Sequence, residues 1–213
     1  MKTILTIIRT VTPSTVHKRH ALNLSTILKK LVFVLVFANY AGYAQQSGIF
    51  ESYIILDNGF GNQQFDLFSP TDTTVDTPAY DYSGSNFGTI GTQNGTLILN
   101  GGQNNVWKCY ASDDITSGWL NYRLYPSGSP TGGWTGINLN ANVFDYGTAC
   151  SGSGTNQSWI RDNANINLLS GLASGDYTLE IYSNADYTYN SGANSSTHYV
   201  NNNGNNFTAT FRA

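Results

Sequence analysis

The sequence predicts an all-β protein: an antiparallel β-sandwich of Ig-like or jelly-roll type, preceded by a signal peptide. Composition gives two reasons. Glycine accounts for 22 of 213 residues and aromatic residues for 13%, whereas methionine occurs once and charged residues make up only 11%. This balance favours turns and strands over helices. The third reason is a series of short apolar segments separated by turn residues, which is typical of a sandwich. A barrel is the alternative.

Four short apolar segments open the part of the chain after the leader, and we expect them to be strands at residues 50–56, 65–68, 96–100 and 105–110. Gly101 and Gly102 separate the last two segments, and such a pair is typical of a turn or a bulge. Residues 70–77 are polar and flanked by proline, so we expect a loop there. Residues 80–84 are expected to be irregular.

Residues 119–125 alternate most clearly, and Leu120, Tyr122 and Leu124 would share the face that enters the core. Further strands are predicted at residues 134–139 and 156–161, with a loop of small residues between them at 147–155.

The C-terminal third begins with a short turn or single helical turn at residues 166–172. Tyr177, Leu179 and Ile181 then alternate with polar residues, as in a strand with one buried face. Residues 186–196 are rich in Tyr, Asn and Ser and predict a loop. The remaining elements are a short strand, a turn and a final strand, at residues 197–201, 202–206 and 207–211.

Residues 1–44 have the pattern of a secretory signal peptide. Lys29 and Lys30 precede the apolar run at residues 31–38, and small residues lead to a cleavage site after Ala44. The run is too short to cross a bilayer, which takes about 20 residues. We therefore expect a secreted protein, extracellular or at the cell surface, with no membrane span after cleavage and a single β-sandwich domain at residues 45–213.

The charge of residues 45–213 argues against nucleic acid as a partner. Four basic residues stand against thirteen acidic residues, a formal charge of −9. Proteins bind phosphate backbones mainly by neutralising them with Lys and Arg.

Cys109 and Cys150 are the two cysteines of the chain. In an oxidising compartment an even number of cysteines predicts a disulfide, and two buried free thiols are the alternative.

No catalytic residue is predicted, and we expect the protein not to be an enzyme. His198 is the one histidine after residue 44, and Glu51 and Glu180 are the two glutamates. Glycosidases need two carboxylates close together, and Glu180 is equally explained by a cross-strand pair with Arg123. A small polysaccharide lyase or hydrolase is the competing interpretation, with Tyr122, Arg123, His198 and Tyr199 as a conceivable lyase set.

No metal site or cofactor is predicted from a ligand motif. Calcium is an alternative, because Asp57, Asn58 and Asp66, or Asp72 and Asp76, have the oxygen ligands that it prefers.

Aromatic residues supply the candidate ligand contacts. If Leu120 points inward, then Trp119, Arg123 and Tyr125 point outward, and Tyr182 points outward with Glu180 on the later strand. Trp134 and Trp159 flank glycine-rich loops. The tentative ligand-binding residues are Trp119, Arg123, Tyr125, Trp134, Trp159 and Tyr182. Aromatic rings beside amides are suited to sugars, although these side chains would also serve simply to cover a sheet.

Several segments, in the same order along the chain, resemble the Ig-like accessory modules of secreted Bacteroidetes proteins that use type IX export. They are residues 97–102, 106–108, 120–125, 129–139, 168–182 and 203–211. The resemblance implies a non-catalytic sandwich that assists a hydrolase, a nuclease or an adhesin. We therefore expect a carbohydrate-binding, adhesion or accessory module whose partner is an extracellular polysaccharide or a cell-surface protein. A purely structural protein-interaction domain is a further alternative.

Overall fold

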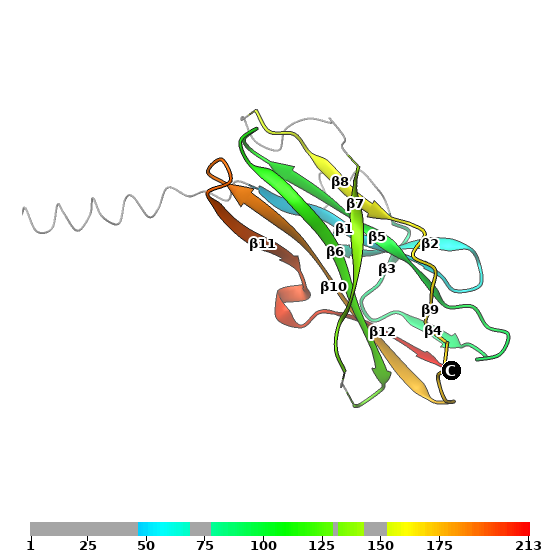
Figure 1. Cartoon of the computed structure of the whole chain (residues 1–213). Helices are drawn as coiled ribbons and strands as arrows, with labels where there is room; N and C mark the ends of the chain where they lie inside the picture. The colour runs from blue at the N-terminus through cyan, green and yellow to red at the C-terminus, as the bar shows by residue number, and fades with distance from the viewer. Residues whose placement is uncertain (1–46, 69–77, 130–131, 143–152) are drawn as a thin grey trace, which may run out of the picture. The chain divides into compact units, whose positions relative to one another are not determined.

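The computed structural model describes residues 47–68, 78–129, 132–142 and 153–213, and strands make up most of these residues (Figure 1). All of them belong to one unit that begins at Gln45. The strands are β1 (Ser47–Asp57), β2 (Asn62–Phe68), β3 (Tyr80–Asp81), β4 (Asn86–Thr89), β5 (Ile98–Lys108), β6 (Asp114–Pro126), β7 (Thr135–Asn142), β8 (Gln157–Arg161), β9 (Ile166–Asn167), β10 (Asp176–Tyr189), β11 (Asn194–Val200) and β12 (Phe207–Arg212). The prediction of an all-β fold is confirmed.

The strands form one curled sheet whose two halves face each other across the core. The first half has the order β3-β2-β1-β5-β8, with β9 beside β5, and the second has the order β7-β6-β10-β12-β4, with β11 beside β10. β7 joins the halves, since residues 135–139 pair with β6 and residues 140–142 pair with β8. Figure 1 shows β6 and β10 side by side over much of their length, in agreement with their register.

The sheet is mixed rather than purely antiparallel, which corrects one part of the prediction. β2 pairs with β3 in parallel, and β12 pairs with β4 in parallel. Both parallel partners are short strands at the ends of the strand order. The long central strands pair in antiparallel fashion, as the alternating sequence pattern predicts.

Both halves contribute apolar side chains to the core. The alternation predicted for β10 is confirmed, because Leu179 and Ile181 are fully buried and Tyr177 nearly so. The last strand buries its predicted inward residues Phe207, Ala209 and Phe211 in the same way. The main core residues of the two halves are Ile54, Leu56, Leu97, Leu99, Val106, Leu120, Leu139, Leu179, Ile181, Ala209 and Phe211.

The glycine pair at residues 101–102 makes a bulge rather than a turn. β5 runs without interruption through both predicted segments, and its pairing with β1 shifts register between Ile55 and Leu56. Gly101 has φ +132°, and a Cβ atom there would lie 2.2 Å from the carbonyl oxygen of Arg161. A left-handed backbone and close contact with β8 therefore both call for glycine at this position.

The segment predicted as a loop at residues 186–196 is a β-hairpin, so that prediction is wrong. β10 continues to Tyr189, and β11 begins at Asn194. The turn between them has positive φ at Asn190, Ser191 and Gly192. Hydrogen bonding keeps this polar segment extended, since β10 pairs with β6 on one side and with β11 on the other. Residues 166–172, predicted as a short turn or a single helical turn, are the short strand β9 followed by a turn at residues 168–171, which is not helical.

Several predicted features lie outside the described residues. They are the signal peptide, the polar loop at 70–77, the acidic residues Asp72 and Asp76, and most of the loop around Cys150. Cys109 is disulfide-bonded and the described residues contain no free cysteine. The pairing of Cys109 with Cys150 stays a prediction, because Cys150 is not among those residues.

Candidate functional site

One face of the second half of the sheet carries most of the residues predicted as ligand contacts. β6 and β10 are neighbours, and Arg123 lies directly opposite Glu180. Opposed residues in an antiparallel pair point to the same side, and alternate residues of each strand join them. Trp119, Tyr125 and Tyr182 therefore lie on the same face as Arg123 and Glu180, as predicted for neighbouring strands. We call this the outer face.

Glu180 is the centre of a polar cluster on the outer face, and only 5% of this residue is exposed. Arg123 donates from Nε to Oε2 at 2.9 Å and from a terminal nitrogen to Oε1 at 3.0 Å. The Tyr125 hydroxyl donates to Oε2 at 2.8 Å, and the Asn206 amide donates to Oε1 at 2.6 Å. The cross-strand pair between Arg123 and Glu180 is thus confirmed, and charge-assisted bonds of this kind fix side-chain positions well.

The environment of Glu180 favours the charged carboxylate. Burial raises the pKa of this carboxyl, but the hydrogen bonds from Asn206, Tyr125 and Arg123 and the positive charge of Arg123 outweigh burial, so the pKa is lowered. Burial and the hydrogen bond to Glu180 raise the pKa of the Tyr125 phenol. Glycosidases instead raise the pKa of their general acid. The arrangement suits a fixed structural ion pair better than proton transfer.

Aromatic rings form a row beside this cluster. The Trp134 and Tyr182 ring centroids are 4.7 Å apart at an interplanar angle of 78°. Tyr182 and Tyr199 follow at 6.3 Å and 48°. The guanidinium carbon of Arg123 lies 4.6 Å from the Trp134 ring centroid, within the range of a cation–π contact. We call Trp134, Tyr182 and Tyr199 the aromatic row.

The two ends of the aromatic row are accessible. Trp134 is 36% exposed and Tyr199 is 59% exposed, whereas Tyr182 between them is half-buried. Burial, followed by the nearby Tyr199, raises the pKa of the Tyr182 phenol. A ligand can therefore contact the rings of Trp134 and Tyr199, and the half-buried Tyr182 ring lies between them.

Trp119 lies on the outer face beyond the row and is held by a chain of hydrogen bonds. Its indole nitrogen donates to Ser117 Oγ at 3.0 Å, and Ser117 Oγ donates to Asp186 at 2.6 Å. Thr197 of β11 donates to the other oxygen of Asp186 at 2.6 Å. These bonds link β6, β10 and β11, and they fix the indole of Trp119 in place.

Two predicted contact residues do not lie at the surface. Trp159 is 9% exposed and belongs to the core, where its side chain packs against Gly118. Its position next to a small-residue loop suggested exposure, but β8 turns the ring inward. Tyr125 does point to the outer face but is 7% exposed, because its hydroxyl binds the buried Glu180. The prediction is therefore wrong for Trp159 as a surface residue and wrong for Tyr125 as an exposed one.

The conceivable lyase set is divided between the two sides of the sheet, with Arg123 and Tyr199 on the outer face and Tyr122 and His198 on the other side. Tyr122 packs against the core, whereas its neighbour Arg123 is on the outer face. Ser52 points into the core, where its hydroxyl bonds Ser183, so Glu51 faces the opposite side of the first half of the sheet. The core separates Glu51 from Glu180, and the two-carboxylate geometry of a glycosidase is not formed by this pair.

His198 lies on the opposite side of β11 from Tyr199. Its Nε2 atom is 3.0 Å from Ser47 Oγ, and its ring stacks on Tyr187 with 4.2 Å between centroids. Burial lowers the pKa of this imidazole. The side chain joins β11 to β1 and is half-buried, which gives it a clear structural role.

The calcium interpretation receives no support from the acidic residues of β1 and β2. Asp57 Oδ1 accepts hydrogen bonds from the Gly59 and Gly61 amides and so shapes the β1–β2 turn. Asp66 lies opposite Tyr53, several residues along β2 from that turn. Within the described ranges, no three His, Cys, Asp or Glu side chains are grouped so that they could hold a metal ion. The same ranges contain no helix that is long and apolar enough to cross a membrane.

Sequence reasoning missed several surface aromatic residues as ligand contacts, and three of them bear on the sites of this molecule. Tyr199 is predicted on a short strand and in the conceivable lyase set but not among the ligand contacts, although it ends the aromatic row. Phe60 and Tyr80 are 84% and 49% exposed and line a groove of about 750 Å³ near the β1–β2 turn. The signal for Phe60 is visible in the sequence, since a large apolar residue between Gly59 and Gly61 has no neighbours to bury it.

Comparisons with protein-family models, curated proteins and solved structures found no match to this chain. The resemblance to Ig-like accessory modules of secreted Bacteroidetes proteins therefore stays a prediction.

Proposed function

We propose that this chain is a secreted, non-catalytic module that binds an extracellular polysaccharide through the outer face. The observation that carries the proposal is the aromatic row, with accessible rings at Trp134 and Tyr199 on a face that also carries amides and hydroxyls such as those of Asn121, Asn184 and Ser117. Aromatic rings give large contact area at small conformational cost and stack on the apolar faces of sugar rings. Amides and hydroxyls beside them accept and donate hydrogen bonds to sugar hydroxyls.

The charge of the face supports a neutral polysaccharide. Arg123 and Glu180 neutralise each other, and the oxygens of Asp186 are engaged by Ser117 and Thr197. The unit as a whole is strongly acidic, so a polyanionic glycan would be repelled.

The angles within the aromatic row favour a single twisted polysaccharide chain as the ligand, rather than the flat surface of a crystalline polysaccharide. A sugar stacks on a ring when its face is parallel to the ring plane. The planes rotate by 78° and then by 48° along the row, so successive sugars would also have to rotate. Stacking contacts contribute about 1 kcal/mol each, and we expect a dissociation constant in the range of about 0.01–1 mM.

A non-catalytic role is supported by the state of the candidate acid–base groups. Glu180 is held as a carboxylate by three side chains, and His198 is stacked on Tyr187 with its Nε2 next to Ser47. Neither side chain has the free, tuned geometry that general acid–base catalysis uses.

Isothermal titration calorimetry of the purified protein against neutral plant, algal and microbial glycans tests this proposal. Trp134→Ala and Tyr199→Ala should each weaken binding of the best glycan about 5-fold or more. Phe60→Ala is the matched control, because it removes an exposed ring far more accessible than either but outside the outer face.

If Trp134→Ala and Tyr199→Ala bind the glycan as tightly as the unchanged protein, the binding site is not on the outer face. Capture of a protein partner without binding to any glycan would favour a protein-interaction module. Release of reducing ends or unsaturated products that is lost in Glu180→Gln or His198→Ala would favour the enzymatic interpretation.

A further inference from the structure

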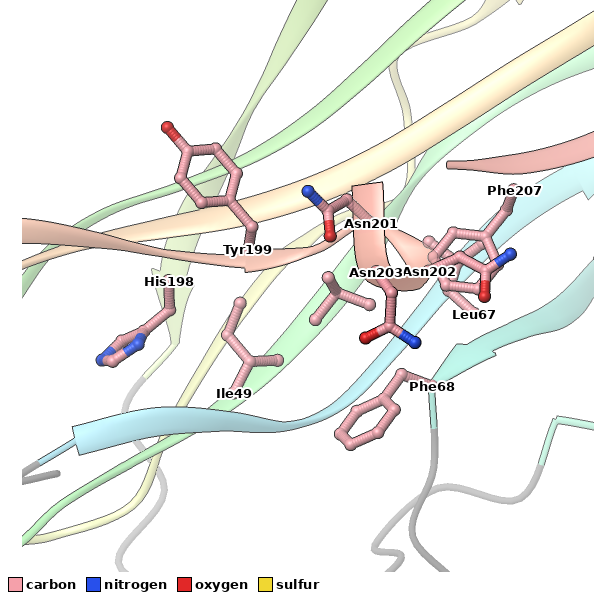
Figure 2. Close-up of a pocket in the computed structure, with 10 residues that line it drawn as sticks. Ile49, Leu67, Phe68, His198, Tyr199, Asn201, Asn202, Asn203 and Phe207 are labelled. Atoms are coloured by element: carbon pink, nitrogen blue, oxygen red, sulfur yellow. The ribbon is translucent and has the colours of Figure 1, made fainter. Parts of the chain in front are cut away.

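A pocket of about 370 Å³ lies between the edge strand β11 and the strands β1 and β2 (Figure 2). Tyr199 is the one residue that the pocket lining shares with the aromatic row. Figure 2 shows the Tyr199 ring and the His198 ring on opposite sides of β11, with the pocket on the His198 side. Its volume is at the lower end of the range for small-molecule sites, which suits one sugar unit rather than a chain.

The floor of the pocket is apolar. Leu67, Val200 and Phe207 are each less than 9% exposed, and Ile49 packs against the same core. No Asp, Glu, Lys or Arg is among the ten residues that line the pocket. A ligand that fits should therefore be neutral and should present a small apolar group to the floor.

The rim contains an asparagine-rich turn with an unusual backbone. Asn202 and Asn203 have φ +48° and +55°, which is the left-handed region, and Gly204 follows with φ +90°. Side chains other than glycine adopt this conformation at a cost, and such residues gather at binding sites more often than elsewhere. The turn is held by hydrogen bonds from the Gly204 and Asn206 amides to the Asn201 carbonyl, at 2.9 and 2.8 Å.

The three consecutive asparagines of the turn have different tasks. The side-chain oxygen of Asn201 accepts a hydrogen bond from Gly204, and the Asn202 side chain donates to the Asn206 carbonyl. Asn203 is exposed, and Figure 2 shows its amide directed toward Ile49 and Phe68. The turn thus presents one amide, with one donor group and one acceptor, over an apolar floor.

We propose that this pocket binds the acetamido group of an N-acetylated sugar. The methyl group would rest on Ile49 and Leu67, and the amide would exchange hydrogen bonds with the Asn203 side chain. The Phe68 ring, 42% exposed at the rim, would contact the pyranose. The proposal rests on the proposed function in that the ligand is a saccharide, but it uses residues outside the aromatic row.

Calorimetry with N,N′,N″-triacetylchitotriose (chitotriose below) and cellotriose tests the proposal, because these trimers have the same linkage and differ in that an acetamido group replaces the 2-hydroxyl. We expect chitotriose to bind about 10-fold more tightly. Asn203→Gly should reduce that preference about 5-fold while leaving cellotriose binding unchanged, since it removes one amide contact and glycine tolerates the left-handed backbone. Phe68→Ala should weaken chitotriose binding as well.

Trp134→Ala is the matched control on the outer face and should leave the preference between the trimers unchanged. Equal affinity for the two trimers, or a preference that survives both Asn203→Gly and Phe68→Ala, would overturn the pocket proposal. Cellotriose binding that depends on Trp134 would still support the proposed function in that case. Absence of binding to any saccharide would overturn both proposals.

Discussion

Ser52 of β1 and Ser183 of β10 join the two halves of the sheet by a hydrogen bond of 2.8 Å inside the core. Both residues are fully buried. Ser52 donates its own proton to Asn104 Oδ1 at 2.8 Å, so Ser183 must be the donor between the two serines. Asn104 in turn donates to the Asn184 carbonyl at 3.0 Å. A small network of buried hydrogen bonds therefore connects the two halves of the sheet across the core.

Because Ser183 donates to Ser52 and Ser52 donates to Asn104, removing the Ser52 hydroxyl should lower the free energy of unfolding more than removing the Ser183 hydroxyl. Ser52→Ala deprives Asn104 of a donor and Ser183 of an acceptor, and we expect a loss of about 2–4 kcal/mol in the free energy of unfolding. Ser183→Ala removes only the donor to Ser52, so about 1 kcal/mol should be lost. Urea denaturation of both variants checks the ratio, and equal losses would contradict the assigned direction of the bonds.

The contacts of Glu180 predict a large loss of stability when one of its carboxylate oxygens is replaced by an amide nitrogen. Glu180→Gln leaves the partly buried Arg123 without its counter-charge, and we expect the free energy of unfolding to fall by about 2–3 kcal/mol. Asp176→Asn is the control, because the pair of Asp176 with Arg212 spans 3.6 Å between two side chains that are at least 60% exposed. That variant should change stability by less than about 1 kcal/mol. Thermal and urea unfolding provide the comparison, and similar losses in both variants would exclude a special role for Glu180.

The lowered pKa of His198 predicts a loss of stability in mildly acidic solution. The unfolded chain binds a proton on this imidazole near pH 6.5, while the folded chain resists it because of burial. The unfolded state therefore gains protons first, and the free energy of unfolding should fall as the pH drops from about 7 through 6.5 toward the folded pKa.

His198→Gln should abolish that slope between about pH 7 and 5 and leave the steeper acid unfolding below it. Comparing the pH dependence of the two proteins, rather than their absolute stability, separates titration from the loss of the ring stack on Tyr187. Parallel curves for the two proteins would contradict the prediction.

The sequence predicts a strand correctly where one face of that strand is apolar. The prediction fails where a polar segment is extended only because it pairs with neighbouring strands. Tyr177, Leu179 and Ile181 alternate with polar residues, so their strand and its inward face are correctly predicted. The same strand continues to Tyr189 through a polar segment, which β6 and β11 keep extended. No local pattern reports these partners, and the segment is therefore predicted as a loop.

The candidate site shows the same limit. The outward direction of Trp119, Arg123 and Tyr125 follows from alternation along one strand. The burial of Tyr125 depends on Glu180, which is 55 residues away along the chain. Trp159 is misplaced because glycine-rich flanks are equally compatible with an exposed ring and with a ring that enters the core. The Asn202–Asn203 turn is predicted as a turn, but its left-handed backbone and the pocket beneath it depend on β1 and β2.

The pairing of β6 with β10 also determines how late in synthesis the sheet can form, because the two strands are far apart in the sequence. Arg123 and Glu180 are 57 residues apart, and Ser52 and Ser183 are 131 residues apart. Contacts between such distant positions require closure of long loops and make folding slow compared with local hairpins. The first half contains no strand after β9, but the second half cannot be completed before β10 and β12 have been synthesised. A chain with this order of contacts therefore cannot close its core between the two halves until β10, near the end of the chain, has been synthesised.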